Sequence, residues 1–320
     1  MNDPIIALTG ATGFIGNHLL HALTRRGYRI RVLLRSPVAL PPDCANAVIG
    51  ALNRPVNMAA ALAGVDTVIH SAGLAPTMTG SPDEDFRRLD TAATGNLAQA
   101  AQHAGVRRFI YLSSLRAQAD VSARDVLTED LPPVPTDAYG RSKLAAEQEL
   151  SQRDLDWVAL RLALVFGPGV KGNIARLVDV ARSPYWLPFG ALRAKRSLLS
   201  LENLVTAVET VIGTAQSLRR PLIVADPDPL NIAEMITAMR AGLGRRRGLI
   251  PVPGTILHAG FRLAGRGELY RRLAEPLVGD PARLLTLGWV PRVTTSAALA
   301  VLARSPNHQT AAAGSQSRPH

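Results

Sequence analysis

The chain has 320 residues, which is enough for one large domain or two modest ones around a full hydrophobic core. Apolar residues make up 47% and charged residues 19%, which excludes a disordered polyelectrolyte and indicates a folded globular protein. The formal net charge is +11, but all but three of the 36 basic side chains are arginines and only 4% of residues are aromatic. No basic stripe alternates with aromatic residues, so we expect no nucleic-acid partner.

The sequence also predicts where the protein works. No run of about 18 uncharged apolar residues occurs, so we expect no transmembrane segment. The first residues lead directly into the apolar run 5–8 without a basic leader, and Cys44 is a lone cysteine. These features predict a reducing, cytoplasmic setting.

Short apolar runs alternate with helical patterns through the first half of the chain. We expect strands at 4–9, 29–34, 47–49, 67–70, 109–113 and 157–162, and helices at 14–26, 56–63, 83–104 and 138–152. Strand and helix in alternation predict an α/β fold with a doubly wound parallel sheet covered by helices on both faces. Ligands of such sheets bind at the carboxyl ends of the strands.

Glycine and proline become more frequent after residue 166, which indicates shorter elements and more loops. A helix at 201–213 and a strand at 222–225 are expected to return to the main sheet. We therefore predict a main domain at 1–166, completed by about 198–226. A smaller α/β domain follows at 167–197 and 227–304, and a disordered tail at 305–320.

A glycine-rich segment follows the first predicted strand and opens the first predicted helix. Gly10 and Gly13 allow a tight turn and a close backbone approach, and Gly16 lets helix and strand touch. The helix then presents unpaired N–H groups to a pyrophosphate, so the segment predicts a dinucleotide site.

The end of the second predicted strand bears on the choice of dinucleotide. No aspartate or glutamate follows this strand to accept hydrogen bonds from the adenosine ribose, and Arg35 stands there instead. A guanidinium can pair with a 2′-phosphate, so Arg35 slightly favours NADP over NAD, although a surface arginine would also explain it.

Tyr139 and Lys143 are four residues apart in a predicted helix and therefore share a face. An ammonium beside a phenol favours the phenolate, which makes Tyr139 a candidate general base. Ser114 ends the strand upstream and brings a hydroxyl to the carboxyl edge of the sheet. His18 and His21 have no apparent third ligand, so we expect no metal.

These three elements together resemble the extended short-chain dehydrogenases/reductases, in the NAD-dependent epimerase/dehydratase family. Gly10-x-x-Gly13-x-x-Gly16, Ser114 and Tyr139-x-x-x-Lys143 carry the resemblance. It extends to the segments 139–148, 166–173, 188–197, 202–205 and 287–291, which are similar to the branch of UDP-glucose 4-epimerase-like proteins and UDP-4-keto-N-acetylhexosamine 4-reductases.

The resemblance implies an NAD(P)-binding Rossmann domain with a substrate domain above it, and hydride transfer at C4 of a UDP-hexose or UDP-N-acetylhexosamine. It implies a catalytic centre of Ser114, Tyr139 and Lys143. The implied cofactor contacts are Gly10, Thr12, Gly13, Phe14, Ile15, Gly16, Arg35, Leu52, Ala72, Gly73, Tyr139 and Lys143. The implied substrate contacts are Ser114, Tyr139, Lys171, Asn173, Arg196 and Arg283.

Several questions stay open at this point. Asp90 stands where the family usually has asparagine, Ala51 replaces an aspartate near adenine, and the usual proline and asparagine are missing from 161–164. The same centre serves a 4-epimerase and a 4-ketoreductase, and Arg35, suited to a dissociable NADPH, slightly favours the reductase. Reduction of a hydrophobic ketone and a non-catalytic dinucleotide sensor are the alternatives. We also leave open a homodimer.

Overall fold

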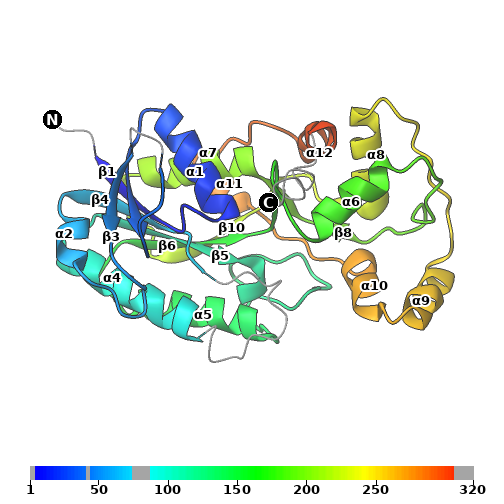
Figure 1. Ribbon diagram of the computed structural model, residues 1–320. Helices are drawn as coiled ribbons and strands as arrows, with labels where there is room; N and C mark the ends of the chain where they lie inside the picture. Colours follow the sequence, from blue (N-terminus) through cyan, green and yellow to red (C-terminus); the bar gives the residue numbers. More distant parts are fainter. Residues whose placement is uncertain (1–3, 41–43, 74–86, 306–320) are drawn as a thin grey trace, which may run out of the picture.

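The protein is built on a sheet of parallel strands. The computed structural model describes residues 4–40, 44–73 and 87–305. In this part of the chain the main sheet has seven strands in the order β10-β6-β5-β4-β1-β2-β3 (Figure 1). The strands are β1 Ile5–Thr9, β2 Arg29–Leu34, β3 Ala45–Val48, β4 Val65–His70, β5 Arg108–Ser114, β6 Trp157–Leu162 and β10 Arg220–Val224.

The strand order reverses at β1, which pairs with β2 on one side and with β4 on the other. In open sheets of this kind the loops at such a reversal separate and leave a crevice for ligands. The carboxyl ends of β1 and β4 therefore position the site.

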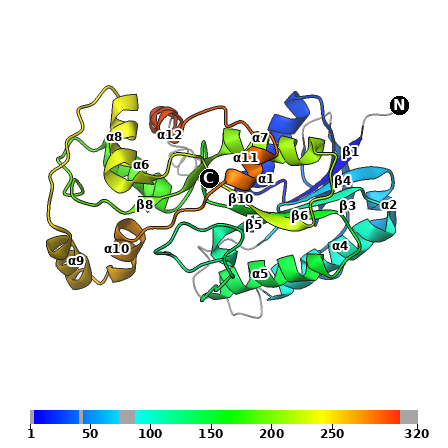
Figure 2. The same ribbon diagram turned by 180° about the vertical axis from the view of Figure 1, so that it is seen from behind.

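Helices cover both faces of the sheet, as Figures 1 and 2 show. The helices on one face are α1 Phe14–Arg25 and α7 Leu201–Gly213, and those on the other are α2 Met58–Leu62, α4 Ala93–His103 and α5 Ala138–Ser151. Alternate residues of each strand point to opposite faces, so Ile6 and Leu8 pack with the first group and Ala7 with the second. Burial on both faces explains why these strands read as continuous apolar runs.

A smaller group of elements lies beyond one end of the sheet (Figure 1). Its short strands pair as β7 Leu164–Phe166 with β9 Leu198–Ser200 and as β8 Lys195–Arg196 with β11 Leu230–Asn231. Its helices are α6 Asn173–Arg182, α8 Ile232–Gly242, α9 Gly254–Leu263, α10 Gly267–Ala274 and α12 Thr295–Arg304, whereas α11 Ala282–Thr286 packs against β10 of the main sheet. A separate core joins α6, α8 and α12.

The structure confirms the predicted α/β fold and its parallel sheet. The predicted ranges 29–34, 157–162 and 201–213 coincide with β2, β6 and α7. The helix predicted at 83–104 is confirmed as continuous helical structure from residue 87 to 103 in the described part of the chain, although its first six residues, Arg87–Ala92, are π-helical and only α4 is an α-helix. The predicted tail at 305–320 lies outside the described residues except for Ser305. The division into two domains stays a prediction.

No helix within the described ranges is both long enough and apolar enough to cross a bilayer.

Candidate functional site

The loop between β1 and α1 is held in backbone contact with its neighbours. Gly10 has a positive φ of 70°, and a Cβ there would lie 2.6 Å from the backbone nitrogen of Ala72. A Cβ on Gly16 would lie 2.1 Å from the carbonyl oxygen of Gly10. Side chains are therefore excluded at both positions, and the loop, α1 and the segment after β4 meet through their backbones.

The start of α1 suits an anionic group. Gly13 is the N-cap residue, no side chain caps the helix, and no acidic residue stands in the first turn. The first amides of a helix have no partner within it, and here they belong to Phe14 and Ile15, with Thr12 exposed beside them. Because the glycine cradle leaves these amides accessible to a phosphate oxygen, the residues present fit the pyrophosphate of a dinucleotide.

The residues predicted around the adenosine end follow the neighbouring strands β2 and β3. Arg35 is exposed directly after β2. Leu52 follows β3 and is half-buried, and its carbonyl oxygen accepts a hydrogen bond from Asn96 Nδ2 at 3.4 Å. No aspartate or glutamate stands beside Arg35 at the end of β2.

Ala72 and Gly73 connect the glycine loop to the catalytic candidates. The backbone amide of Ala72 donates to Thr9 Oγ1 at 3.3 Å. A Cβ on Gly73 would lie 2.6 Å from Asp90 Oδ1 and 3.0 Å from Lys143 Nζ. Both predicted cofactor residues thus lie between the loop after β1 and the face of α5 that carries Lys143.

Ser114 and the start of α5 are brought together by a charged pair. Ser114 Oγ accepts from the backbone amide of Arg116 at 3.2 Å, and Arg116 Nη2 donates to Asp137 Oδ2 at 2.6 Å. Asp137 in turn caps α5 by accepting from the backbone amide of Gly140. A Cβ on Gly140 would lie 2.3 Å from the carbonyl oxygen of Arg116, so the turn after β5 packs directly on α5.

Tyr139 is half-buried and Lys143 is buried one turn further along α5. Lys143 Nζ lies 5.8 Å from the centre of the Tyr139 ring and 4.9 Å from that of Tyr111, a distance at which an ammonium and an aromatic ring attract each other. Lys143 Nζ also donates to the carbonyl oxygen of Leu112 at 3.4 Å and faces Asp90 Oδ1 at 3.8 Å.

Electrostatics keep Lys143 charged. Burial alone would lower the pKa of Lys143, but Tyr111, Tyr139 and Asp90 raise it by more. Burial raises the pKa of Tyr111, which Lys143 partly opposes. The Tyr111 hydroxyl has no well-formed hydrogen bond among the described residues, so the ammonium is the polar group that faces it.

A buried ion pair fixes α5 against the sheet. Arg161 on β6 and Glu147 on α5 are both buried, and Arg161 Nη2 donates to Glu147 Oε2 at 2.6 Å. Ser113 donates to the same carboxylate, and the side-chain oxygen of Gln118 accepts from Arg161 Nη1. This support was missed in the sequence, although Glu147 is four residues beyond Lys143 on the same helix face.

A buried histidine links the strand ends beneath the site. The Thr94 hydroxyl donates its proton to the carbonyl oxygen of Asp90, so its oxygen is left to accept a hydrogen bond from His70 Nε2. His70 Nδ1 then carries no proton and accepts from the Thr9 hydroxyl. Burial, with a smaller contribution from Lys143, lowers the pKa of His70 to about 3. The histidine is therefore neutral and connects the end of β1 to the helix that carries Asp90.

Of the predicted substrate residues, Ser114 and Tyr139 lie at the main sheet, whereas Lys171, Asn173 and Arg196 lie in the smaller group of elements. Lys171 is exposed and Asn173 begins α6 after Gly172, which has a φ of 72°. Arg196 on β8 is half-buried and donates to the carbonyl oxygens of Glu275 and Val121.

Arg283 is held by acidic side chains. It forms ion pairs with Glu129 and Asp130, and Glu129 is itself nearly buried. The fold thus brings Ala72 and Gly73, predicted to bind the cofactor, close to the predicted catalytic Lys143, while Arg196 and Arg283 are engaged with partners of the protein itself.

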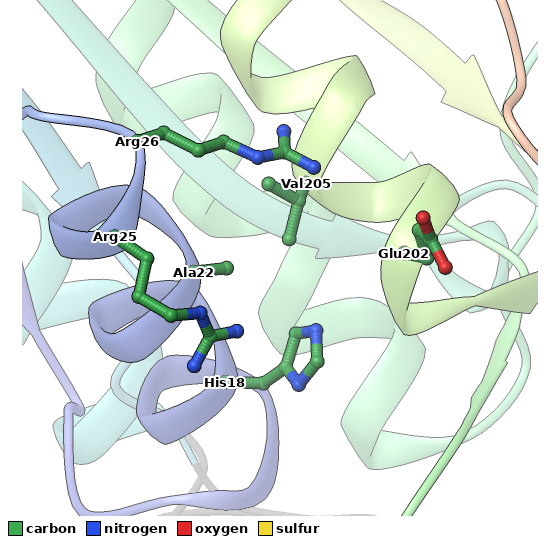
Figure 3. Close-up of a pocket in the computed structure, with 6 residues that line it drawn as sticks. All are labelled: His18, Ala22, Arg25, Arg26, Glu202 and Val205. Carbon is green, nitrogen blue, oxygen red and sulfur yellow. The ribbon is translucent and has the colours of Figure 1, made fainter.

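A pocket that the sequence did not predict lies between α1 and α7 (Figure 3). It is lined by His18, Ala22, Arg25, Arg26, Glu202 and Val205. Burial and the neighbouring Arg25 lower the pKa of His18. None of the predicted site residues lines this pocket.

Comparisons with known proteins agree with this geometry. The profile of the NAD dependent epimerase/dehydratase family matches residues 6–225. A UDP-glucose 4-epimerase from Vibrio cholerae is 32% identical and covers 90% of this chain and 91% of its own. A 3-beta-hydroxysteroid dehydrogenase from Mycolicibacterium neoaurum is 25% identical and covers 92% of this chain and 89% of its own. The solved structure of MoeE5 in complex with UDP-glucose and NAD matches with a TM-score of 0.69 and 26% identity. The match covers 94% of this chain and 97% of the MoeE5 chain.

Proposed function

Because the chain belongs to the NAD dependent epimerase/dehydratase family, we propose that it is an NAD(P)-dependent oxidoreductase acting at C4 of a nucleotide sugar. The substrate class is a UDP-hexose or UDP-N-acetylhexosamine. The observation that carries the proposal is the placement of Tyr139 beside the buried ammonium of Lys143, at the strand ends where the glycine loop also lies. Similarity to a UDP-glucose 4-epimerase across nine-tenths of the chain supports the sugar nucleotide.

The chemistry assigned to the chain is proton transfer at the O4 oxygen. Tyr139 exchanges the O4 proton, and Lys143 stabilises the phenolate that forms when the proton leaves. Ser114 donates a hydrogen bond to O4, since no described residue accepts its hydroxyl proton. A nicotinamide dinucleotide, held by the glycine loop and by Ala72 and Gly73, would supply the hydride chemistry at C4.

The substrate diphosphate is assigned to the smaller group of elements. Arg196 stays the main candidate, because its guanidinium is anchored on two carbonyl groups and a planar fork suits phosphate oxygens. Lys171 and Asn173 are the candidates on the exposed loop before α6. Arg283 is the weaker candidate, since Glu129 and Asp130 already neutralise it.

NADP is the proposed physiological coenzyme. Arg35 is exposed at the end of β2, where a 2′-phosphate would face it, and no carboxylate competes with the phosphate there. Since a reductase must exchange its coenzyme in every cycle, this preference also favours a 4-ketoreductase, whereas the similarity to a UDP-glucose 4-epimerase favours an epimerase.

The deciding experiment incubates the purified protein with UDP-hexoses and UDP-N-acetylhexosamines without added reductant. Inversion at C4, followed by NMR of the sugar, identifies an epimerase. A second incubation contains NADPH and a UDP-4-keto sugar. Stoichiometric oxidation of the NADPH there, with no inversion in the first incubation, identifies a reductase. If a protein that is folded and binds the dinucleotide does neither, action at C4 of a nucleotide sugar is refuted.

Reduction of a hydrophobic ketone is the second candidate. The specific observation in its favour is that Arg196 and Arg283 both have partners within the protein, so neither is needed to bind a substrate diphosphate. Similarity to a 3-beta-hydroxysteroid dehydrogenase over 92% of the chain also supports it. A hydroxysteroid assayed with the oxidised dinucleotide distinguishes the two, because a site built for a diphosphate gives turnover with UDP-sugars only.

A further inference from the structure

Lys143 is neutralised by a carboxylate in this protein. Asp90 is fully buried, and its Oδ1 lies 3.8 Å from Lys143 Nζ, which is also buried. Gly73 closes the space beside the pair, since a Cβ there would meet both Asp90 Oδ1 and Lys143 Nζ. A buried carboxylate without a counter-charge is costly, so these contacts hold the two groups together as an ion pair.

Several contacts fix the position of Asp90. Ser142, next to Lys143 on α5, donates to Asp90 Oδ2 at 3.1 Å. The carbonyl oxygen of Asp90 accepts from Thr94, which in turn is bonded to His70. Asp90 lies in the π-helical segment before α4, and this turn brings its side chain against α5.

The charged and titratable groups around Lys143 are few. Tyr111 faces it from β5, Tyr139 from α5 and Asp90 from the π-helical segment, while His70 on β4 is neutral. One turn further along α5, Glu147 is paired with Arg161, so that carboxylate is already balanced. Among these described groups, Asp90 supplies the negative charge that opposes the ammonium.

We propose that Asp90 is a positioning residue that holds Lys143 and balances its charge, and thereby weakens the field of the ammonium at Tyr139. The field of the ammonium at Tyr139 favours the phenolate, and a carboxylate behind the ammonium weakens that field.

The inference rests on the proposed role of Tyr139, but its test needs no turnover. The ultraviolet absorbance of tyrosinate is followed against pH for the unchanged protein and for Asp90→Asn, and each curve is corrected with its Tyr139→Phe counterpart. The isolated Tyr139 curve is expected to move to lower pH by about one unit in Asp90→Asn, as for the loss of one nearby charge. An unchanged midpoint, or a move to higher pH, overturns the proposal.

The matched control is Asp66→Asn, which removes a carboxylate at the opposite end of β4, where Asp66 pairs with Arg107. It should leave the Tyr139 curve in place, and an equal shift there would overturn the proposal. If Asp90→Asn does not fold, the smaller Asp90→Ser, which admits water beside Lys143, must give the same shift. A merely structural Asp90 would lower stability in these variants without moving the midpoint.

Where turnover is measurable, the basic limb of the pH profile should shift with the Tyr139 curve in Asp90→Asn. If nucleotide sugars prove not to be substrates, the titration still tests Asp90.

Discussion

At the scale of single residues, the site concentrates charge where water is excluded. Lys143 is buried among Tyr111, Tyr139 and Asp90, and each of them raises its pKa against the effect of burial. An ammonium that stays charged under these conditions acts strongly on its neighbours, since little solvent screens it. Tyr139 is the neighbour that is only half-buried, so it is the one that a substrate can reach.

The first prediction concerns Tyr139. Tyr139→Phe removes the hydroxyl that we propose exchanges the O4 proton, so turnover should fall by roughly 100-fold or more while dinucleotide affinity is kept. Steady-state kinetics and a dinucleotide titration measure the two effects. Tyr270→Phe is the matched control, because its hydroxyl donates to the carbonyl oxygen of Gly254 in another part of the fold.

Ser114→Ala should have a milder effect than Tyr139→Phe, since it removes one hydrogen bond and leaves the proton carrier. Turnover of Tyr139→Phe close to that of the unchanged protein would refute the assigned mechanism.

The second prediction concerns the coenzyme. If Arg35 pairs with a 2′-phosphate, NADP binds more tightly than NAD, and Arg35→Ala removes most of the difference, on the order of 10-fold for one charge-assisted contact. Calorimetric titration of both dinucleotides measures it. Arg29→Ala, at the opposite end of β2, is the control and should leave the ratio unchanged. Equal affinities in the unchanged protein would show that Arg35 is simply a surface arginine.

At the scale of elements, hydrophobic runs and glycine spacing were sufficient to predict the sheet and the dinucleotide loop. The strand 157–162 was predicted to the residue because it is buried on both faces, so all of its residues except Arg161 are apolar. The third strand was placed two residues late, at 47–49 instead of Ala45–Val48, because an edge strand with an exposed first half lacks that signal.

The rest of the site depends on contacts between distant segments. Asp90 was visible in the sequence only as a departure from a family pattern, and its contact with Lys143 arises from a π-helical turn that no periodicity predicts. Arg116 and Asp137 likewise join β5 to α5 through a pair 21 residues apart. The substrate residues remain predictions, because Arg196 and Arg283 are bound to groups of the chain itself.

The third prediction compares two glycines with positive φ. Gly10→Ala would bring a Cβ to 2.6 Å from the backbone of Ala72, whereas Gly27, with a φ of 87°, has no atom within 4 Å of the added carbon. Gly27→Ala should therefore cost only about 1 kcal/mol of unfolding free energy from backbone strain and leave dinucleotide affinity unchanged.

Gly10→Ala should cost more and should also lower dinucleotide affinity by about 10-fold or more, because the displaced loop no longer presents the α1 amides. Chemical denaturation and dinucleotide titration measure the two quantities. The same affinity in both variants would contradict the assignment of the loop.

At the scale of the whole molecule, the buried histidine makes stability depend on pH. The folded protein holds His70 neutral down to about pH 3, whereas an exposed histidine takes up a proton near pH 6.5. Between these values the unfolded chain binds one more proton than the folded one, so unfolding becomes more favourable as the pH falls. The effect reaches at most about 1.4 kcal/mol per pH unit.

The fourth prediction isolates this effect with His70→Gln, which cannot take up the proton. The unfolding free energy of the unchanged protein minus that of the variant should be constant above pH 6.5 and decrease towards pH 3. Taking the difference removes the opposite contribution of Asp226, whose pKa is raised to about 6 by burial. Denaturant titrations at several pH values measure it, and a difference independent of pH would mean that His70 takes up its proton as readily in the folded protein as in the unfolded chain.

The pairing of β6 with β10 has a consequence for synthesis on the ribosome. Trp157–Leu162 is translated well before Arg220–Val224, and α6, β8, β9 and α7 are made between them. Until β10 emerges, the edge of β6 that will pair with it has no partner strand, and five of the six side chains of β6 are apolar. A nascent chain stopped before residue 220 should therefore recruit chaperones or aggregate, whereas one that extends past residue 225 can close its sheet.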